Sequence, residues 1–167
     1  AVFKRKLNQV ALLDSDMKTM KVMNIRDGEI AYKLPESWDL EEKSFPSEAI
    51  INYNEYRSRD KIISGFMSVE KSSETIEKAI ERHKAVVEES YTLKNYTSSK
   101  IVLSSGEAYR VSYEYTPEKS GQYIAHEYYL DKGEYLVKFT FYVVKDRYKD
   151  TMVIAFNTIV ESLALNF

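Results

Sequence analysis

The chain has 167 residues, 44% of them hydrophobic and 30% charged, which suits one soluble globular domain and excludes a disordered chain. It has no cysteine, so disulfides, thiolate catalysis and cysteine-ligated metals are excluded. The net charge of −2 gives no reason to expect a nucleic-acid partner, and no apolar run reaches the ~20 residues of a membrane helix.

The N-terminal stretch differs in charge from the remainder. Residues 1–24 hold five basic and two acidic residues, a net +3 that leaves −5 for the rest. We interpret residues 1–20 as an arm or tether, and residues 21–167 as a single domain. The chain starts at Ala1, so either a leader has been removed or the start reflects expression.

Residues 21–34 predict a hairpin, because Asp27-Gly28 is a strong hairpin turn signal. Pro35 ends the second strand. The single tryptophan, Trp38, is expected to fill the core rather than to bind a ligand. Residues 41–46 are read as a polar connection.

Two strands are predicted at 48–56 and 61–69, and Gly65 within the second indicates a bulge or a close backbone approach. Ser73 is the expected N-cap of a helix over 73–91. Its apolar stripe is Ile76, Ala79, Ile80, His83, Val86 and Val87.

A strand at 95–103 turns at Ser104-Ser105-Gly106, and a loop of two or three residues decides whether Ile101 or Val102 points inward. A second long helix is predicted to begin at Asp146. Its stripe is Met152, Ala155, Phe156, Ile159, Val160 and Leu163, with Phe156 expected against the preceding strands.

Residues 108–144 form the clearest element, a meander of three strands with period-two alternation. A turn at Lys132-Gly133 would pair Asp131 with Glu134, and a loop over 117–120 would pair Thr116 with Gly121. This register places Arg110, Glu127 and Lys138 in one row across a sheet face, with His126 on the other face.

The row of charges has two readings. A cross-strand ladder, worth roughly 0.2–1 kcal/mol per pair, is the more common arrangement. The alternative is the floor of an anion-binding groove made by Arg110, Glu127 and Lys138. Among the 14 tyrosines, the polar-face members Tyr123, Tyr129 and Tyr142 are candidates for a contact surface, unless a helix covers them.

We find no catalytic constellation in the sequence. Its two histidines, His83 and His126, fall on packed faces, and no Gly-rich phosphate loop or hydrolase motif occurs. The expectation is a protein without enzymatic activity, cofactor or metal.

The segment Tyr32-Lys33-Leu34-Pro35-Glu36-Ser37-Trp38 resembles the strand–Pro–x–x–Trp opening of PsbP-like proteins. The later order of elements, over roughly residues 20–166, is similar to that superfamily too. Its members include an extrinsic photosystem II subunit, a Ran-binding import factor and bacterial envelope lipoproteins such as DcrB. No lipobox cysteine is present here, so a lipid anchor would depend on residues not shown.

The resemblance implies an α+β fold in which helices flank an antiparallel sheet as an α/β/α sandwich. It also implies a non-catalytic, extracytoplasmic binding or adaptor domain, with a protein partner and membrane proximity through its N-terminus. The alternatives are a carrier of a small hydrophobic ligand in a cavity between sheet and helix, and a cytoplasmic location. A helix-grip or lipocalin-like carrier is the rival fold.

Overall fold

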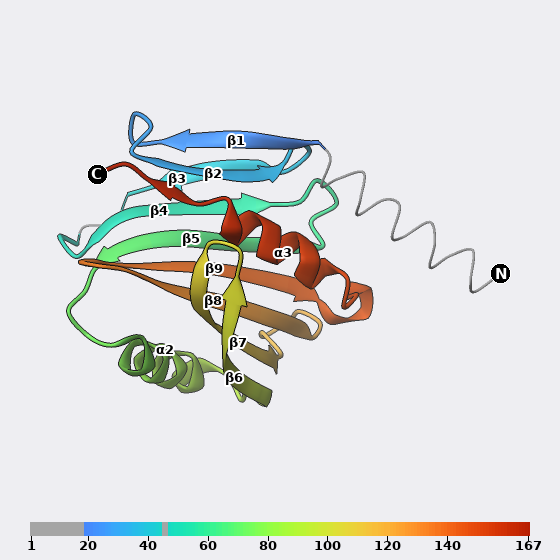
Figure 1. Cartoon of the computed structure of the whole chain (residues 1–167). Helices are drawn as coiled ribbons and strands as arrows, with labels where there is room; N and C mark the ends of the chain where they lie inside the picture. The colour runs from blue at the N-terminus through green and yellow to red at the C-terminus, as the bar shows by residue number, and fades with distance from the viewer. Residues whose placement is uncertain (1–18, 45–46) are drawn as a thin grey trace. The chain divides into compact units, whose positions relative to one another are not determined.

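The computed structural model describes residues 19–44 and 47–167 (Figure 1). Most of the expected arm at 1–20 therefore lies outside the described residues. The described residues divide into two compact units, one formed by residues 19–38 with 149–167 and the other by residues within 39–148. The single domain expected over 21–167 stays a prediction.

The smaller unit is built on a hairpin with one helix. Strands β1 (Met20–Ile25), β2 (Ile30–Pro35) and β10 (Ala164–Leu165) form an antiparallel sheet in the order β1-β2-β10. Ile25 pairs with Ile30 across a four-residue loop. Within that loop Asp27 and Gly28 both have positive φ, of 54° and 85°. The hairpin predicted at Asp27-Gly28 is confirmed.

Helix α3 (Met152–Glu161) contacts β2 within this unit. The burial expected for Phe156 and Trp38 is confirmed, at 0% and 4% exposed. The contact of Phe156 with the meander stays a prediction. The expected start of the helix is wrong, because Asp146 lies in the 3-10 turn η1 (Lys145–Arg147) and α3 follows Thr151, which makes no side-chain cap.

The larger unit contains a seven-stranded antiparallel sheet in the order β3-β4-β5-β9-β8-β7-β6. Its strands are β3 (Asp39–Lys43), β4 (Ile50–Arg57), β5 (Ile63–Lys71), β6 (Lys94–Leu103), β7 (Gly106–Tyr115), β8 (Tyr123–Lys132) and β9 (Tyr135–Val144). The polar connection predicted at 41–46 is wrong for residues 41–43, which belong to β3, a strand with four charged residues among its five. An exposed edge strand tolerates and even favours such residues, since charge discourages pairing with other chains.

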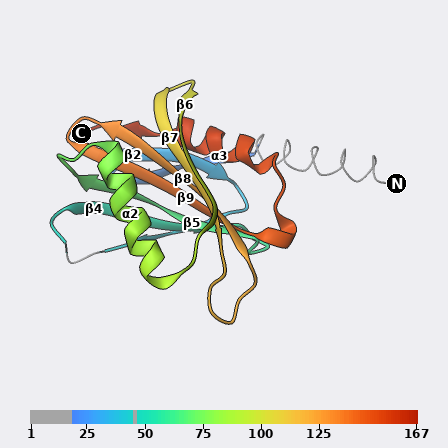
Figure 2. The same ribbon diagram turned by 90° about the horizontal axis from the view of Figure 1, so that it is seen from below.

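Helix α2 (Ile76–Ser90) lies on one face of this sheet (Figures 1 and 2). Thr75, not Ser73, is its N-cap, and its side chain accepts a hydrogen bond from the Lys78 amide. Val86 is 58% exposed, so its place in the predicted stripe is wrong. The buried core between α2 and the sheet consists of Ala79, Ile80, Val111, Tyr113, Ala125, Tyr129 and Leu136.

The meander forms, with a register that differs from the prediction. Lys132 pairs with Tyr135, so Gly133 (φ 77°) takes the first position of the two-residue turn, as in type II′ turns. This shift by two residues keeps Glu127 and Lys138 on one face and His126 on the other.

The β7–β8 loop changes the outcome for Arg110. Tyr115 pairs with Tyr123, so the loop spans residues 116–122 instead of 117–120. The pairing is offset by one residue, and Val111 instead of Arg110 lies opposite Glu127. The predicted row is therefore wrong for Arg110, which faces the same side as His126.

The structure also tests the expectations for Gly65 and for the turn at Ser104-Ser105-Gly106. A Cβ on Gly65 would lie 1.9 Å from the Thr140 carbonyl oxygen, which confirms the close backbone approach. Leu103 pairs with Gly106 across two residues, and Val102 is left 82% exposed. Over the described residues, the fold is thus mostly antiparallel sheet with the two α-helices α2 and α3. The α/β/α layering stays a prediction, since α2 and α3 belong to different units.

Candidate functional site

The face of the large sheet that carries α2 has two regions with different surroundings. Under the helix, side chains from β7, β8 and β9 are buried in a polar cluster. Over β3, β4 and β5 the same face forms an open groove that extends to Tyr142 on β9. We call the first region, formed by Glu127, Tyr113, Tyr129, Lys138 and His83, the covered cluster. We call the second region, which includes Tyr53, Glu55, Phe66 and Tyr142, the aromatic groove.

Glu127 is the centre of the covered cluster. It is 3% exposed and accepts hydrogen bonds of 2.6 Å from the hydroxyls of both Tyr113 and Tyr129. The Nζ of Lys138 lies 3.8 Å from its Oε1. Burial and the nearby carboxylate both raise the pKa of each tyrosine, so the hydroxyls remain donors.

Lys138 links this carboxylate to helix α2. Its Nζ lies 2.8 Å from the Nδ1 of His83 and over the rings of Phe66 and Tyr129, at 5.4 and 5.3 Å from their centroids. Burial lowers the pKa of Lys138, while Glu127 opposes that change. Burial, with Lys138 and Arg82 nearby, lowers the pKa of His83 to about 3, so the imidazole is neutral and Nδ1 accepts from the ammonium.

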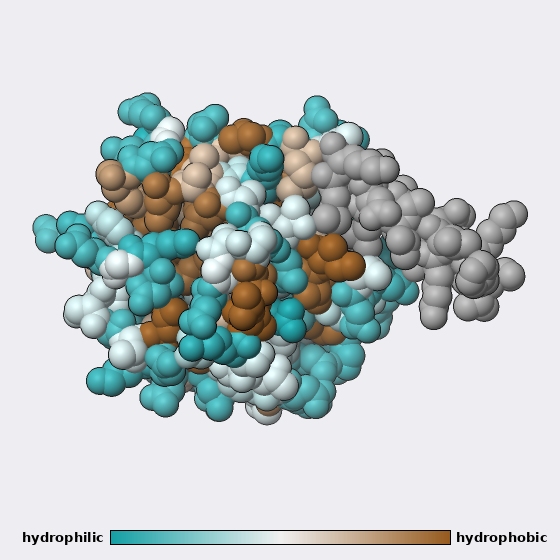
Figure 3. Space-filling model, viewed as in Figure 1, coloured by the Kyte–Doolittle hydropathy of each residue, from teal (hydrophilic) through white to brown (hydrophobic). Residues whose placement is uncertain are grey.

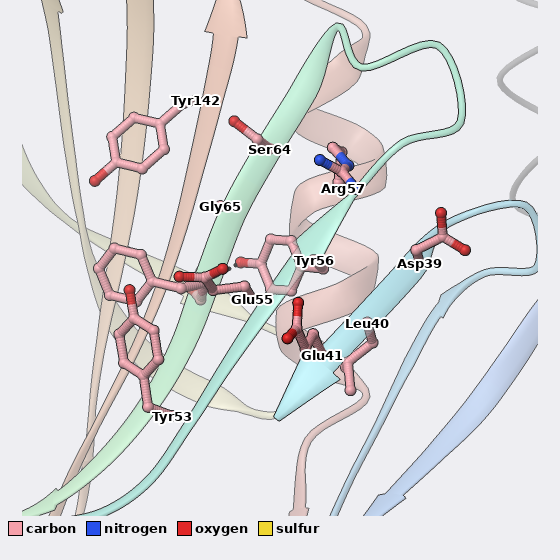
Figure 4. Close-up of a pocket in the computed structure, with 11 residues that line it drawn as sticks. Asp39, Leu40, Glu41, Tyr53, Glu55, Tyr56, Arg57, Ser64, Gly65 and Tyr142 are labelled. Atoms are coloured by element: carbon pink, nitrogen blue, oxygen red, sulfur yellow. Dashed lines mark hydrogen bonds between the residues drawn. The ribbon is translucent and has the colours of Figure 1, made fainter. Parts of the chain in front are cut away.

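The aromatic groove holds about 670 Å³ and is open to solvent (Figure 4). Because odd-numbered residues of β4 and even-numbered residues of β5 share one face of the sheet, the groove is lined from both strands. Its lining residues are Asp39, Leu40, Glu41, Tyr53, Glu55, Tyr56, Arg57, Ser64, Gly65, Phe66 and Tyr142.

A continuous row of aromatic rings begins in the groove and extends beyond it. Tyr53 stacks on Phe66, with centroids 4.9 Å apart and planes at 22°. Tyr142 lies 6.4 Å from Phe66 and 5.9 Å from Tyr115, which it meets edge-on at 72°. Tyr115 then stacks on Tyr123 at 5.8 Å and 30°. These five rings, one from each of β4, β5, β9, β7 and β8, are all partly exposed.

The row continues into a second recess of about 410 Å³ beside the end of α2. Ser64 and Tyr142 line both recesses, so they are neighbours on one surface. Tyr91 borders the second recess and packs on Tyr115 at 5.2 Å. Burial raises the pKa of Tyr115 and Tyr142, so their hydroxyls also stay protonated.

Acidic side chains border the other end of the groove. Glu41 on β3 lies directly opposite Glu55 on β4, an unfavourable pairing of like charges. The Nζ of Lys43 lies 3.1 Å from Glu41. Glu55 forms no ion pair within residues 19–44 and 47–167. The charge at this end of the groove is therefore only partly compensated.

The six residues proposed from sequence occupy three places. Tyr123 and Tyr142 belong to the aromatic row. Glu127, Tyr129 and Lys138 lie in the covered cluster, at most 5% exposed.

Arg110 is on the opposite sheet face, beside Tyr128. Burial raises the pKa of Tyr128 to about 12, and the charge of Arg110 acts against this increase. Sequence reasoning missed Tyr53, Glu55 and Phe66 of the groove. They alternate with buried residues along β4 and β5. This period-two pattern is a signal that could have assigned them to the same sheet face as the polar residues of the meander.

One serine–histidine pair was also missed. The hydroxyl of Ser112 lies 2.7 Å from Nδ1 of His126, and the Tyr148 hydroxyl lies 2.9 Å from Nε2. Both ring nitrogens are thus engaged, and neither recess includes the pair. The arrangement positions His126 within the packed face rather than presenting a nucleophile to a substrate.

Within the described ranges, no group of three or more histidine and acidic side chains is placed to hold a metal ion. Over the same residues, the helices are too short or too polar for a membrane span.

No protein family model matches the chain, and no curated protein matches it. Solved structures do match. The solution structure of cyanobacterial PsbP (CyanoP) from Synechocystis sp. PCC 6803 aligns with a TM-score of 0.60, covering 88% of this chain and 92% of that one. The chain has the PsbP-like fold. At 14% sequence identity the likeness concerns the fold alone.

Two further structures resemble it more distantly, each with a TM-score of 0.49. One is a protein of unknown function from Pseudomonas aeruginosa, described as a putative regulator, at 11% identity over 87% of this chain and 96% of that one. The other is a protein from Bacteroides thetaiotaomicron, at 13% identity over 88% of this chain and 48% of that one. The likeness to CyanoP confirms the PsbP-like fold expected from the Pro–x–x–Trp segment and the element order.

Proposed function

We propose that this PsbP-like chain is a non-catalytic binding or adaptor domain that meets a protein partner through the aromatic groove. The observation that carries the proposal is a row of five partly exposed rings, of which Tyr53, Phe66 and Tyr142 line the open groove and Tyr115 and Tyr123 line the recess that continues it. Tyrosine supplies rigid contact area at low entropic cost, and aromatic anchors dominate the energetics of protein interfaces.

Packing under α2 supports an adaptor over a carrier of a small hydrophobic ligand. The space between the helix and the sheet is filled by tyrosines and by the charged pair Glu127 and Lys138. A carrier would need an enclosed apolar cavity there. The recesses described above are instead open and lined by hydroxyls and carboxylates as well as rings.

An extracytoplasmic, membrane-associated location completes the proposal. Its supports are the PsbP-like fold and the +3 segment that precedes a −5 body. Fractionation of cells carrying the gene with its natural start tests this half of the proposal. Recovery of the protein only in the cytoplasm would contradict it.

Partner capture tests the groove. The full chain is coupled to a resin and compared with its Tyr123→Ala and Tyr142→Ala variants for retention of proteins from the source cells. We expect each variant to lose the specific partner and to keep its circular dichroism spectrum. Tyr135→Ala is the matched control, because Tyr135 is a partly exposed tyrosine on the opposite end of β9 from Tyr142. Equal capture by all four proteins would refute a role of the groove.

A further inference from the structure

The geometry of the aromatic groove limits the shape of what it can bind. Its rings come from five adjacent strands, and the row runs obliquely over them, because Tyr53, Phe66 and Tyr123 lie at the levels of Lys138, Thr140 and Val144 of β9. The successive centroid distances of 4.9, 6.4, 5.9 and 5.8 Å limit the row to about 23 Å. A polyproline II segment of about seven residues has that length, at about 3.1 Å per residue.

The orientation of the rings favours an extended peptide over a sugar. In the pairs Tyr53–Phe66 and Tyr115–Tyr123 the ring planes face each other, at 22° and 30°. Stacking covers one face of each of these rings, which leaves less free ring face for a flat sugar. Tyr142 stands edge-on to Tyr115, so the row is not flat there, which suits the ridged surface of a polyproline II segment better than a planar sugar.

The hydroxyls provide donors that such a peptide requires. Burial raises the pKa of Tyr142, Tyr115 and Tyr53, so all three carry their protons over the physiological range. Polyproline II backbone makes no internal hydrogen bonds, and its carbonyls are free to accept. Protonated tyrosines along the row therefore match the ligand's acceptors.

Charge identifies one end of the ligand. Glu41 and Glu55 oppose each other across β3 and β4, next to Tyr53. Lys43 lies 3.1 Å from Glu41 and compensates part of this charge, whereas Glu55 forms no ion pair among the described residues. A cationic side chain of the ligand beside Glu55 would meet that carboxylate and lie near an aromatic ring, where cations are also stabilised. The ligand should thus carry a basic residue at the end that lies over β3 and β4.

We infer that the aromatic groove and the recess that continues it bind a proline-rich segment of about seven residues in the polyproline II conformation, with an arginine or lysine at one end. This inference rests on the proposed function, because it specifies the kind of partner the groove takes.

Fluorescence anisotropy with the full chain tests it. The probe is a fluorescein-labelled peptide of one arginine followed by six prolines, and the comparison peptide has glutamate in place of arginine. We expect saturable binding of the first peptide, weakened about tenfold by Tyr142→Ala or Tyr123→Ala, as for interface anchors. Replacing arginine with glutamate, or Glu55 with Gln, should weaken binding about fivefold.

The controls lie on the same elements. Glu42→Gln removes the same charge from the other face of β3, and Tyr135→Ala removes a tyrosine outside the groove. Both should bind as wild type does. Since Glu55 and Tyr123 are exposed or partly exposed, their variants remain informative if Tyr142→Ala folds poorly.

Three results would overturn the inference: no saturable binding of the proline peptide, binding that the groove variants leave unchanged, or groove-dependent binding of cellohexaose or chitohexaose in its place. If the peptide fails while Tyr123→Ala and Tyr142→Ala still lose the natural partner, the groove is a protein-binding site for another kind of segment. If both tests fail, the proposed function falls as well.

Discussion

The covered cluster and the aromatic groove use the same residue type on the same sheet face with opposite results. In the cluster, the hydroxyls of Tyr113 and Tyr129 point to one carboxylate and both rings are buried. In the groove, Tyr53 and Tyr142 remain partly exposed, and Glu55 forms no ion pair among the described residues. Polar groups that meet one another under a helix help to specify a fold, whereas polar groups in the open are available to a ligand.

The largest effect should come from the cluster's carboxylate. Glu127→Leu would leave the Lys138 ammonium and two tyrosine hydroxyls buried without their acceptor, at a cost of about 3–5 kcal/mol in unfolding free energy. Urea denaturation measures this cost. Glu55→Leu, in the groove, should stay within about 0.5 kcal/mol of wild type. Similar losses for the two variants would abolish the distinction between the regions.

Gly65, on the strand that borders the groove, provides a second test. A methyl group there would overlap the Thr140 carbonyl oxygen at 1.9 Å and approach the Tyr56 ring at 2.9 Å. We expect Gly65→Ala to lower the unfolding free energy by about 1–3 kcal/mol or more, through forced backbone movement. Gly121→Ala is the control, since nothing lies within 4 Å of its added Cβ and its φ is not in the left-handed range. A wild-type midpoint for Gly65→Ala would contradict the close approach.

The third effect depends on pH and belongs to the cluster alone. The pKa of His83 is lowered to about 3 by burial and by the charges of Lys138 and Arg82 that face it. Between about pH 6.5 and pH 3 the unfolded chain binds a proton at this site and the folded chain does not, so stability falls as the pH falls.

From pH 7 to pH 5, wild type should lose about 2 kcal/mol more than His83→Gln, whose amide oxygen still accepts from Lys138. Glu127 and Tyr129 also face the site but are common to both proteins. Chemical denaturation at the two pH values measures the difference. Parallel pH profiles would show that His83 protonates freely in the folded state.

Much of the fold was predictable because period-two alternation and turn residues act locally. Asp27-Gly28 specified its hairpin, and the alternation around Glu127 placed His126 on the correct opposite face. Loop length was the weak point. The β7–β8 loop is longer than its Pro117–Ser120 turn. The pairing of β7 with β8 is therefore offset by one residue from the predicted register, and Arg110 was predicted on the wrong face. No local signal states how far a loop continues beyond its turn.

The site was less predictable, since it depends on where α2 lies. Alternation put Tyr129 and Tyr142 on the same face, yet only the tertiary packing buries Tyr129 and leaves Tyr142 partly exposed. Strand β3 carries Glu41 to the groove but has a loop-like composition, because an edge strand needs few apolar residues. The groove joins β3, β4, β5 and β9, a set that the sequence order separates.

The placement of Trp38 has a spectroscopic consequence. This single indole is buried in the smaller unit, while 13 of the 14 tyrosines belong to residues 39–148 of the larger one. Fluorescence excited at the red edge of the absorption band thus reports the smaller unit, and tyrosine ultraviolet absorbance reports mainly the larger one. Each unit carries its own native chromophore, and coincidence of the two melting curves measures directly whether they unfold cooperatively.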